Sequence, residues 1–295
     1  MNVERVNGDT SFFIKLNNST KTITYLLDPW LLGSEIDCST CFNEQYLIEP
    51  SISIDKIGKV DAIIISHEFS DHCHEKTLLL LDENIPILAT KSVINRLKRN
   101  SILKNRTLIL IPTTNCKKNK INFLDYNDIK ISLICASGIF DYVHNALIII
   151  PNYSNIKNEN EGIDEKDVFL TNNSSTNTEN DDDKTMKIST GGLLYSPHGI
   201  FISDFSSSII KDLVDYKLDI LLITMTEYKL PLILGGTVNL GLIKAKNVSD
   251  IIKSKVVIDC HSEKKKASGI IPFISRPVYP SKEEIKKWIN NFLDI

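Results

Sequence analysis

The segment at residues 61–74 constrains this chain more than any other stretch of its sequence. It reads Asp-Ala-Ile-Ile-Ile-Ser-His-Glu-Phe-Ser-Asp-His-Cys-His. The apolar run 62–65 is typical of a buried strand, and polar residues follow it at once. Three of the chain's six histidines, His67, His72 and His74, fall in this segment, together with Asp71. Because a strand fixes the backbone and the following loop turns side chains toward one point, imidazole and carboxylate groups placed here predict a metal site.

Two alternatives to this interpretation can be weighed on the residues themselves. In the first, the segment is a polar loop whose histidines cap the next helix, and this alternative stays open. In the second, it is a zincin helix of the H-E-x-x-H type. Glu68 does follow His67, but position 71 holds an aspartate instead of a histidine, which excludes the zincin motif.

The spacing of His67, Phe69, Asp71 and His72 resembles the hallmark of the metallo-β-lactamase superfamily. In that hallmark, a second histidine stands where Phe69 stands here, and Asp-His follows. Further segments resemble the other motifs of the superfamily in the same order along the chain. They are residues 26–31 with a supporting aspartate, Asp28, residues 201–204 ending in a bridging aspartate, Asp204, and residues 256–261 ending in a histidine ligand, His261.

The resemblance implies an α/β chain folded as a four-layer αββα sandwich. It implies one domain over residues 1–295, with Asp28 behind the ligands. It also implies that a metal is held by four side chains that follow apolar strands, namely Asp71, His72, Asp204 and His261.

The other metal position of the superfamily is depleted in this sequence. Phe69 and Ile139, the residue after Gly138, stand where histidines are expected, so that position keeps only His67. We therefore expect one divalent metal, zinc or else iron or manganese. Asp71 and His67 are the catalytic candidates, with His67 placed to hydrogen-bond a water or accept its proton.

Other positions receive more modest interpretations. His144 is expected at the head of a strand, in a structural or substrate-side role more than as a replacement ligand. Gly235 and Gly236 stand in an apolar loop that predicts either a wall of the substrate pocket or a buried turn. His198 is expected in a turn at the end of the 201–204 strand that faces away from the metal. The run Lys264–Lys266 is expected in a solvated turn.

Composition and charge narrow the class of protein. At 295 residues the chain is long enough for one large domain or two small ones, and a hydrophobic fraction of 42% is ordinary for a globular core. A net charge of −3 and a pI near 6.1 argue against a nucleic-acid binder. Neither a signal peptide nor a run of about 20 apolar residues is visible. Six dispersed cysteines do not indicate a disulfide scaffold, so a cytoplasmic location is expected.

Residues 152–187 break the alternation of strand and helix. They are rich in Asn, Ser, Thr, Glu and Asp. Such a composition buries too little apolar surface to offset the entropy of ordering. We expect a disordered insertion in the single domain.

The resulting expectation is a metal-dependent hydrolase of a small molecule. A distant similarity to ascorbate-6-phosphate lactonase points to lactones, esters or phosphoesters. The alternative is a non-catalytic binding protein of the same fold that has lost one or both metals, which Phe69 and Ile139 favour. An iron-dependent redox branch is a third and weaker candidate. The oligomeric state is left open.

Overall fold

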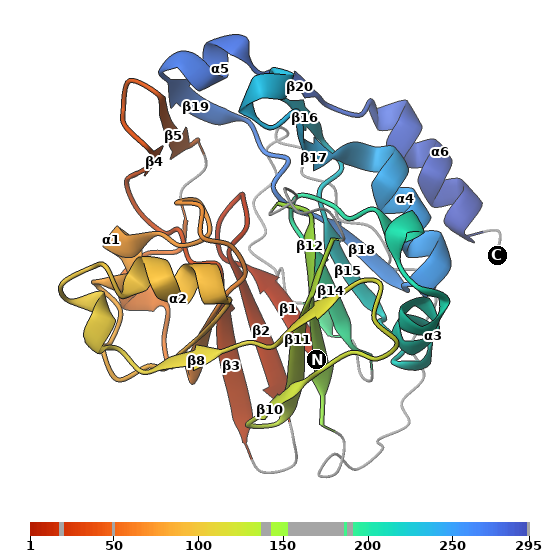
Figure 1. The fold of residues 1–295 in the computed structure, drawn as a ribbon, viewed down its shortest axis with the longest axis horizontal. Coiled ribbons are helices and arrows are strands. Elements are labelled where there is room, and N and C mark those ends of the chain that lie inside the picture. The colour runs from red at the N-terminus through yellow and green to blue at the C-terminus, as the bar shows by residue number, and fades with distance from the viewer. Residues whose placement is uncertain (18–20, 49–50, 137–142, 153–185, 188–190, 294–295) are drawn as a thin grey trace, which may run out of the picture.

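The computed structural model describes residues 1–295 except 18–20, 49–50, 137–142, 153–185, 188–190 and 294–295 (Figure 1). The strands of the amino-terminal half are β1 (Asn2–Arg5), β2 (Phe12–Asn17), β3 (Thr22–Leu27), β4 (Ser34–Asp37), β5 (Asn43–Leu47), β6 (Ala62–Ile65), β7 (Ile87–Ala89), β8 (Leu108–Leu110), β9 (Thr113–Asn115), β10 (Leu124–Tyr126), β11 (Ile129–Cys135) and β12 (Asn145–Pro151). Those of the carboxy-terminal half are β13 (Met186–Lys187), β14 (Leu193–Ser196), β15 (Ile220–Ile223), β16 (Glu227–Lys229), β17 (Thr237–Leu240), β18 (Val256–Asp259), β19 (Lys265–Ser268) and β20 (Arg276–Val278). The α-helices are α1 (Glu75–Leu78), α2 (Lys91–Leu97), α3 (Ser207–Asp215), α4 (Gly241–Ile252), α5 (Ile270–Ile274) and α6 (Lys282–Leu293).

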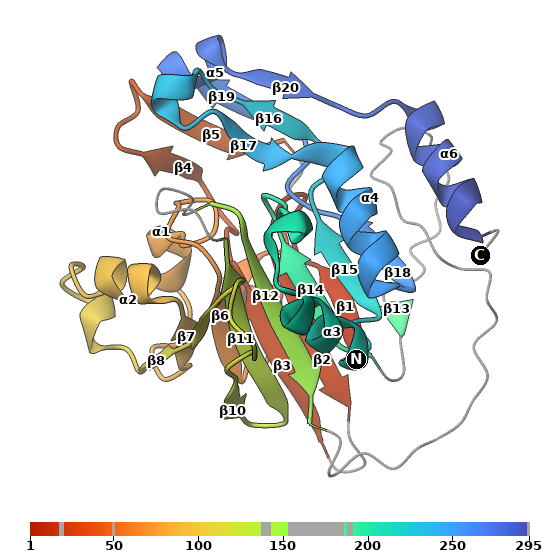
Figure 2. The same cartoon turned by 45° about the vertical axis from the view of Figure 1, so that its right-hand side comes forward.

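Two large sheets face each other in the middle of the molecule (Figures 1 and 2). The first has the strand order β13-β1-β2-β3-β6-β7-β8, and the second has the order β10-β11-β12-β14-β15-β18, with β9 beside β11. In each sheet an antiparallel half continues into a parallel half. The parallel strands are β3, β6, β7 and β8 in the first sheet and β14, β15 and β18 in the second.

The alternation of side chains along the strands produces the four layers. Inward-facing residues of both sheets, such as Ile14, Ile64 and Ile149, form one buried core between them. The outer face of the first sheet packs against α1 and α2. The outer face of the second packs against α3, α4 and α6, where Trp288 is buried. The αββα architecture expected from the sequence is confirmed.

The topology brings four chain segments to the same end of the two sheets. Parallel strands share the edge at which their carboxyl ends meet, and ligand sites form there. Asp28 directly follows β3, and His67 lies two residues after β6. His198 lies two residues after β14, and His261 lies two residues after β18.

Two small sheets lie above this edge. One has the order β19-β5-β4 and the other the order β17-β16-β20. Together with α5 they form the upper part of the molecule in Figure 1, and β17 leads directly into α4. The site is therefore enclosed between the ends of the large sheets and these small ones.

Two expectations about local structure need comment. The strand expected at 201–204 is wrong, because Ile202–Asp204 forms a short 3₁₀ helix and the strand lies earlier, at Leu193–Ser196. Most of the range 152–187, expected to be a disordered insertion, lies outside the described residues. Its last two residues form β13 and pair with β1.

The core between the sheets provides a first prediction. Ile64 on β6 is fully buried there, whereas Ile102 is 61% exposed. We expect Ile64→Ala to lower the free energy of unfolding by about 2–5 kcal/mol, because it leaves a cavity in a close-packed core. Ile102→Ala serves as the control and should stay within about 0.5 kcal/mol of the wild type. Urea unfolding measures both, and equal losses would contradict this account of the core.

Candidate metal centre

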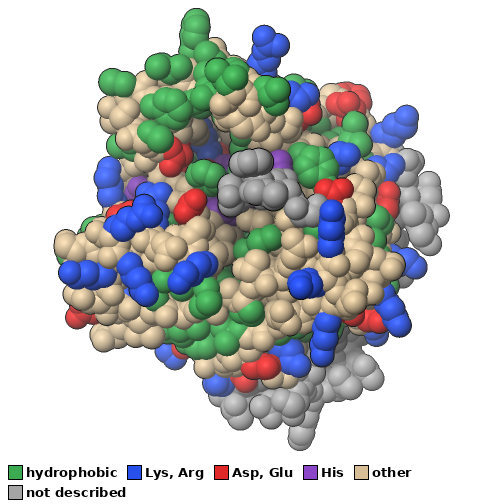
Figure 3. Space-filling view, viewed as in Figure 1, with side chains coloured by type: hydrophobic (Ala, Val, Ile, Leu, Met, Phe, Trp, Pro, Cys, Tyr) green, Lys and Arg blue, Asp and Glu red, His purple; other side chains and the backbone are tan. Residues whose placement is uncertain are grey.

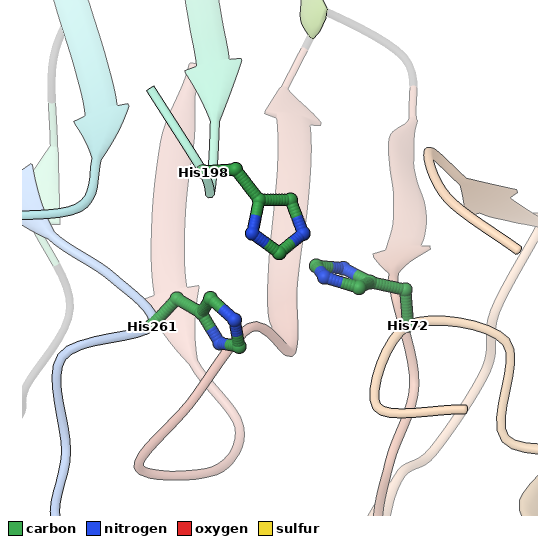
Figure 4. Close-up of side chains that lie close together, drawn as sticks. All are labelled: His72, His198 and His261. Atoms are coloured by element: carbon green, nitrogen blue, oxygen red, sulfur yellow. The ribbon is translucent and has the colours of Figure 1, made fainter. Parts of the chain in front are cut away.

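Three imidazoles converge at the shared end of the sheets. His72, His198 and His261 each offer one ring nitrogen, and these atoms lie within 4.8 Å of one another. Figure 4 shows the three rings turned toward a common point from three separate chain segments. His67 joins the group, with its ring centroid 4.9 Å from that of His198 and 5.2 Å from that of His72.

Each of the three rings is oriented by a partner on its other nitrogen. The Nδ1 atom of His72 lies 2.7 Å from Asp28, that of His198 lies 2.8 Å from Asn239, and that of His261 lies 2.6 Å from Asp9. A hydrogen bond at Nδ1 fixes the tautomer and directs Nε2 at the centre. Metal-binding histidines are usually held by this arrangement.

The atoms that face the centre lack partners in the described structure. The Nε2 atoms of His67, His72 and His198 and the Oδ1 atom of Asp71 are all buried without a hydrogen bond. Asp71 Oδ1 is 3.7 Å from His72 Nε2, and Asp71 Oδ2 is 3.5 Å from His261 Nε2. Buried polar atoms are normally satisfied, so four such atoms around one point indicate a missing partner. Imidazole nitrogens and a carboxylate fit a divalent ion such as zinc, iron or manganese.

The electrostatics of the site divide the histidines into two kinds. Burial and the neighbouring imidazoles hold the pKa values of His67 and His198 well below the ordinary value, so both rings are neutral. Burial would also lower the pKa of His72, but the carboxylates of Asp71 and Asp28 outweigh it and raise that pKa to about 9.

Asp28 is the most connected residue behind the centre. Its Oδ1 accepts a hydrogen bond from the backbone N–H of Ser66 at 2.7 Å, and its Oδ2 accepts from Tyr195 Oη and bonds His72 Nδ1, each at 2.7 Å. Asp28 and His261 both have positive φ angles, 41° and 59°. These sparsely populated conformations turn each side chain sharply at the end of its strand.

A lysine shares the acidic side of the site. Lys265 Nζ lies 2.7 Å from Asp9, 3.4 Å from Glu263 and 3.7 Å from Asp71. The expectation of a solvated turn for Lys264–Lys266 is therefore wrong at Lys265, which points inward from β19. Asp9, His261 and Glu263 also have oxygen and nitrogen atoms close enough to hold an ion, but the ammonium group of Lys265 already contacts both carboxyl groups of that cluster.

A cavity of about 1030 Å³ opens beside the centre. Asp71, His198 and His261 lie on its wall, so the metal position is accessible from it. The two small sheets provide most of the opposite wall.

The remaining predicted residues take different places. His144 lines the cavity, where its Nε2 contacts the carbonyl oxygen of Val238 at 3.1 Å. Gly235 also lines the cavity, and both Gly235 and Gly236 have positive φ angles, 112° and 73°, which explains why glycine is needed. Ile139 lies outside the described residues.

Asp204 is not part of the centre. Asp204 is exposed on the 3₁₀ helix, and its side chain contacts Ser203. The strand of that motif ends at Ser196, so His198 reaches the position expected for Asp204. The expectation that His198 faces away from the metal is wrong for the same reason.

The sequence signal for His198 was present but ambiguous. A buried strand followed two residues later by a histidine is the pattern already seen at Ile65 and His67. No local pattern marks Asp9 or Asn239. Asp9 stands 252 positions before the histidine that it orients.

Neither a family model nor a curated protein sequence matches the chain. Isothiocyanate hydrolase from Delia radicum gut bacteria superposes with a TM-score of 0.58 at 13% identity, over 100% of this chain and 94% of that chain. A possible metal-dependent hydrolase from Veillonella parvula DSM 2008 does so with a TM-score of 0.57 at 13% identity, over 100% and 94%. YhfI from Bacillus subtilis, a metallo-β-lactamase fold protein, gives 0.50 at 9% identity, over 99% and 92%.

This chain has the metallo-β-lactamase fold. His198, which follows β14, belongs to the cluster of imidazoles, whereas Asp204 lies outside it. In this fold, histidines that follow β6, β14 and β18 meet at the centre, with Asp71 3.7 Å from His72 and 3.5 Å from His261.

The raised pKa of His72 makes a prediction about metal affinity. A metal must displace the proton that the ring carries in the folded protein up to a pH of about 9. We expect the affinity for Zn²⁺ to rise about tenfold per pH unit between roughly pH 7 and 9, because metal binding releases one proton from His72 over this range. Competition with a chromogenic chelator measures this slope. The Asp28→Asn variant lacks a charge that raises the pKa of His72, so its affinity should depend less steeply on pH. Equal slopes in the variant and the wild type would contradict the role given to His72.

Proposed function

We propose that this protein is a metal-dependent hydrolase of a small molecule, with one divalent ion held by Asp71, His72, His198 and His261. The observation that carries the proposal is the set of buried atoms without hydrogen bonds around one point, namely Nε2 of His67, His72 and His198 and Oδ1 of Asp71. Zinc is the ion favoured for this donor set, and iron or manganese suit it as well.

The bound ion supplies Lewis acidity, which lowers the pKa of water and polarises the oxygen of a substrate. The protein's own residues supply position. Asp28, Asn239 and Asp9 fix the rings. His67 is neutral and buried, and its Nε2 has no hydrogen bond, so this atom can accept a hydrogen bond from a water at the centre and orient it.

Access to the centre supports catalysis over a purely structural metal. Four protein ligands usually close a zinc site unless its coordination expands. Here, however, Asp71, His198 and His261 all lie on the wall of a large cavity. A substrate that enters the cavity therefore meets the ligands directly.

The structural neighbours agree with this proposal through their names, two of which describe hydrolases. At 13% identity they share the fold, and the substrate and the number of metals are our own proposals. The candidate substrates are lactones, esters and phosphoesters.

We also propose a cytoplasmic location. The six cysteines, all at described positions, form no disulfide, which supports the cytoplasm. In the part of the chain that the structure describes, no helix is both long and apolar enough to cross a bilayer.

The second candidate function is that of a non-catalytic binding protein. Phe69 favours it, because this ring stands where the superfamily has a histidine and stacks on His67 at 6.0 Å. Turnover separates the two functions, since a binding protein hydrolyses nothing even when it holds metal.

Metal content tests the proposed ligand set. We expect about one equivalent of metal per chain in protein purified without chelator, and the same in Asp204→Ala, because Asp204 is exposed and away from the centre. His198→Ala should retain less than about a tenth of this amount, since it removes a ligand. Elemental analysis measures all three proteins, with circular dichroism to verify folding. Loss of metal in Asp204→Ala but not in His198→Ala would refute the assignment.

A further inference from the structure

We propose that the substrate is an uncharged ester or lactone whose acyl part carries an apolar chain, and not a phosphoester. This inference rests on the proposed function and narrows its substrate class. Two features of the cavity support it: its side-chain cations are engaged in ion pairs, and part of its wall is apolar.

The cations of the cavity wall are already occupied. Among the described lining residues these are Arg96 and Lys265. Arg96 Nε lies 2.9 Å from Glu75, and its Nη1 donates to the carbonyl oxygen of Glu68. Lys265 is held by Asp9 at 2.7 Å. Sites for phosphoryl transfer place Arg, Lys or Mg²⁺ on the transferred group, whereas both side chains here are engaged with protein groups.

The same wall is rich in carboxyl groups. Its acidic members are Glu35, Asp37, Glu68, Asp71 and Glu263. An anion entering the cavity would lose part of its hydration, and both side-chain cations among the described lining residues are already held by protein groups. Apart from the proposed ion, a phosphate group would find few partners for its charge here, so this lining favours uncharged substrates over phosphate esters.

Aromatic and aliphatic side chains form a further part of the wall, beside neutral polar ones such as Asn43, Thr226 and Ser275. The apolar members include Phe42, Phe69, Phe201, Leu234 and Ile271. Phe69 is the member beside the centre, since its ring stacks on His67 and meets His198 edge-on at 6.0 Å. The position next to the reacting group is therefore apolar.

The apolar surface continues outward from the cavity. Leu232, Ile233 and Phe273 are 89%, 92% and 90% exposed, and they are neighbours in sequence of the lining residues Leu234 and Ile271. Figure 3 shows hydrophobic side chains gathered on the upper part of the molecule, above the hollow in which histidines are visible. A chain of several carbons on the substrate has apolar surface to contact along this path.

The reaction is a simple hydrolysis. The oxygen of water forms a bond to the acyl carbon, and the bond from that carbon to the leaving oxygen breaks. The leaving oxygen takes a proton from water, so an ester yields an acid and an alcohol and a lactone yields a hydroxy acid. No further reactant is needed.

Matched 4-nitrophenyl substrates test the inference with one leaving group. We expect metal-loaded protein to hydrolyse 4-nitrophenyl hexanoate with a kcat/KM about tenfold or more above that of the acetate, because the longer chain buries more apolar surface. 4-Nitrophenyl phosphate and bis(4-nitrophenyl) phosphate should react at the rate of a chelator-treated blank. Faster turnover of either phosphoester would overturn the inference and leave the hydrolase proposal standing. No metal-dependent turnover of any of the four would overturn the hydrolase proposal, and the inference with it.

Phe69 provides the variant test. We expect Phe69→Ala to lower the hexanoate-to-acetate ratio of kcat/KM about tenfold, since the apolar wall beside the centre is lost. Phe69→Leu retains an apolar side chain and should keep most of the ratio. A ratio unchanged in Phe69→Ala, in protein with full metal content, would remove Phe69 from the proposed wall.

Discussion

The buried carboxylate of Asp28 is the interaction on which the rest of the site depends. It follows β3, accepts from the backbone of Ser66 after β6, orients His72, and receives the hydroxyl of Tyr195 from β14. One side chain thus joins strand ends from both large sheets. An unpaired carboxylate in such a place would be costly, so its partners hold the sheets in register at the edge where the ligands emerge.

A second set of charges extends this framework to the end of the chain. Asp9 from the β1–β2 loop orients His261 and pairs with Lys265 on β19. Asn239 on β17 orients His198 and also contacts the carbonyl oxygen of His261 at 3.4 Å. The small sheets therefore do more than enclose the cavity, because two of their residues help position the centre.

The sequence predicts the parts of this structure that are local and misses those that depend on distant contacts. Apolar runs predict the buried strands, and His67, Asp71 and His72 follow one such run within a few residues. The sequence does not predict that His198 belongs to the centre. Asp204, a few residues later, matches the superfamily motif better than a histidine in a Ser-Pro-His-Gly turn. A run of three lysines predicts a solvated side chain at Lys265, and only the tertiary fold brings Asp9 and Glu263 around it. Asp9 and Asn239 have no signal at all, since each acts on a histidine supplied by another part of the chain.

Phe69 links the chemistry of the centre to the choice of substrate. A histidine at this position would contribute a donor atom, whereas the phenylalanine offers none and leaves His67 Nε2 without a partner. The same ring turns the neighbouring part of the cavity apolar. Phe69 thus offers no ligand atom to an ion and provides the surface that an uncharged chain prefers. The missing donor atom and the apolar wall are two consequences of a single side chain, and the imidazoles of His72, His198 and His261 still converge beside it.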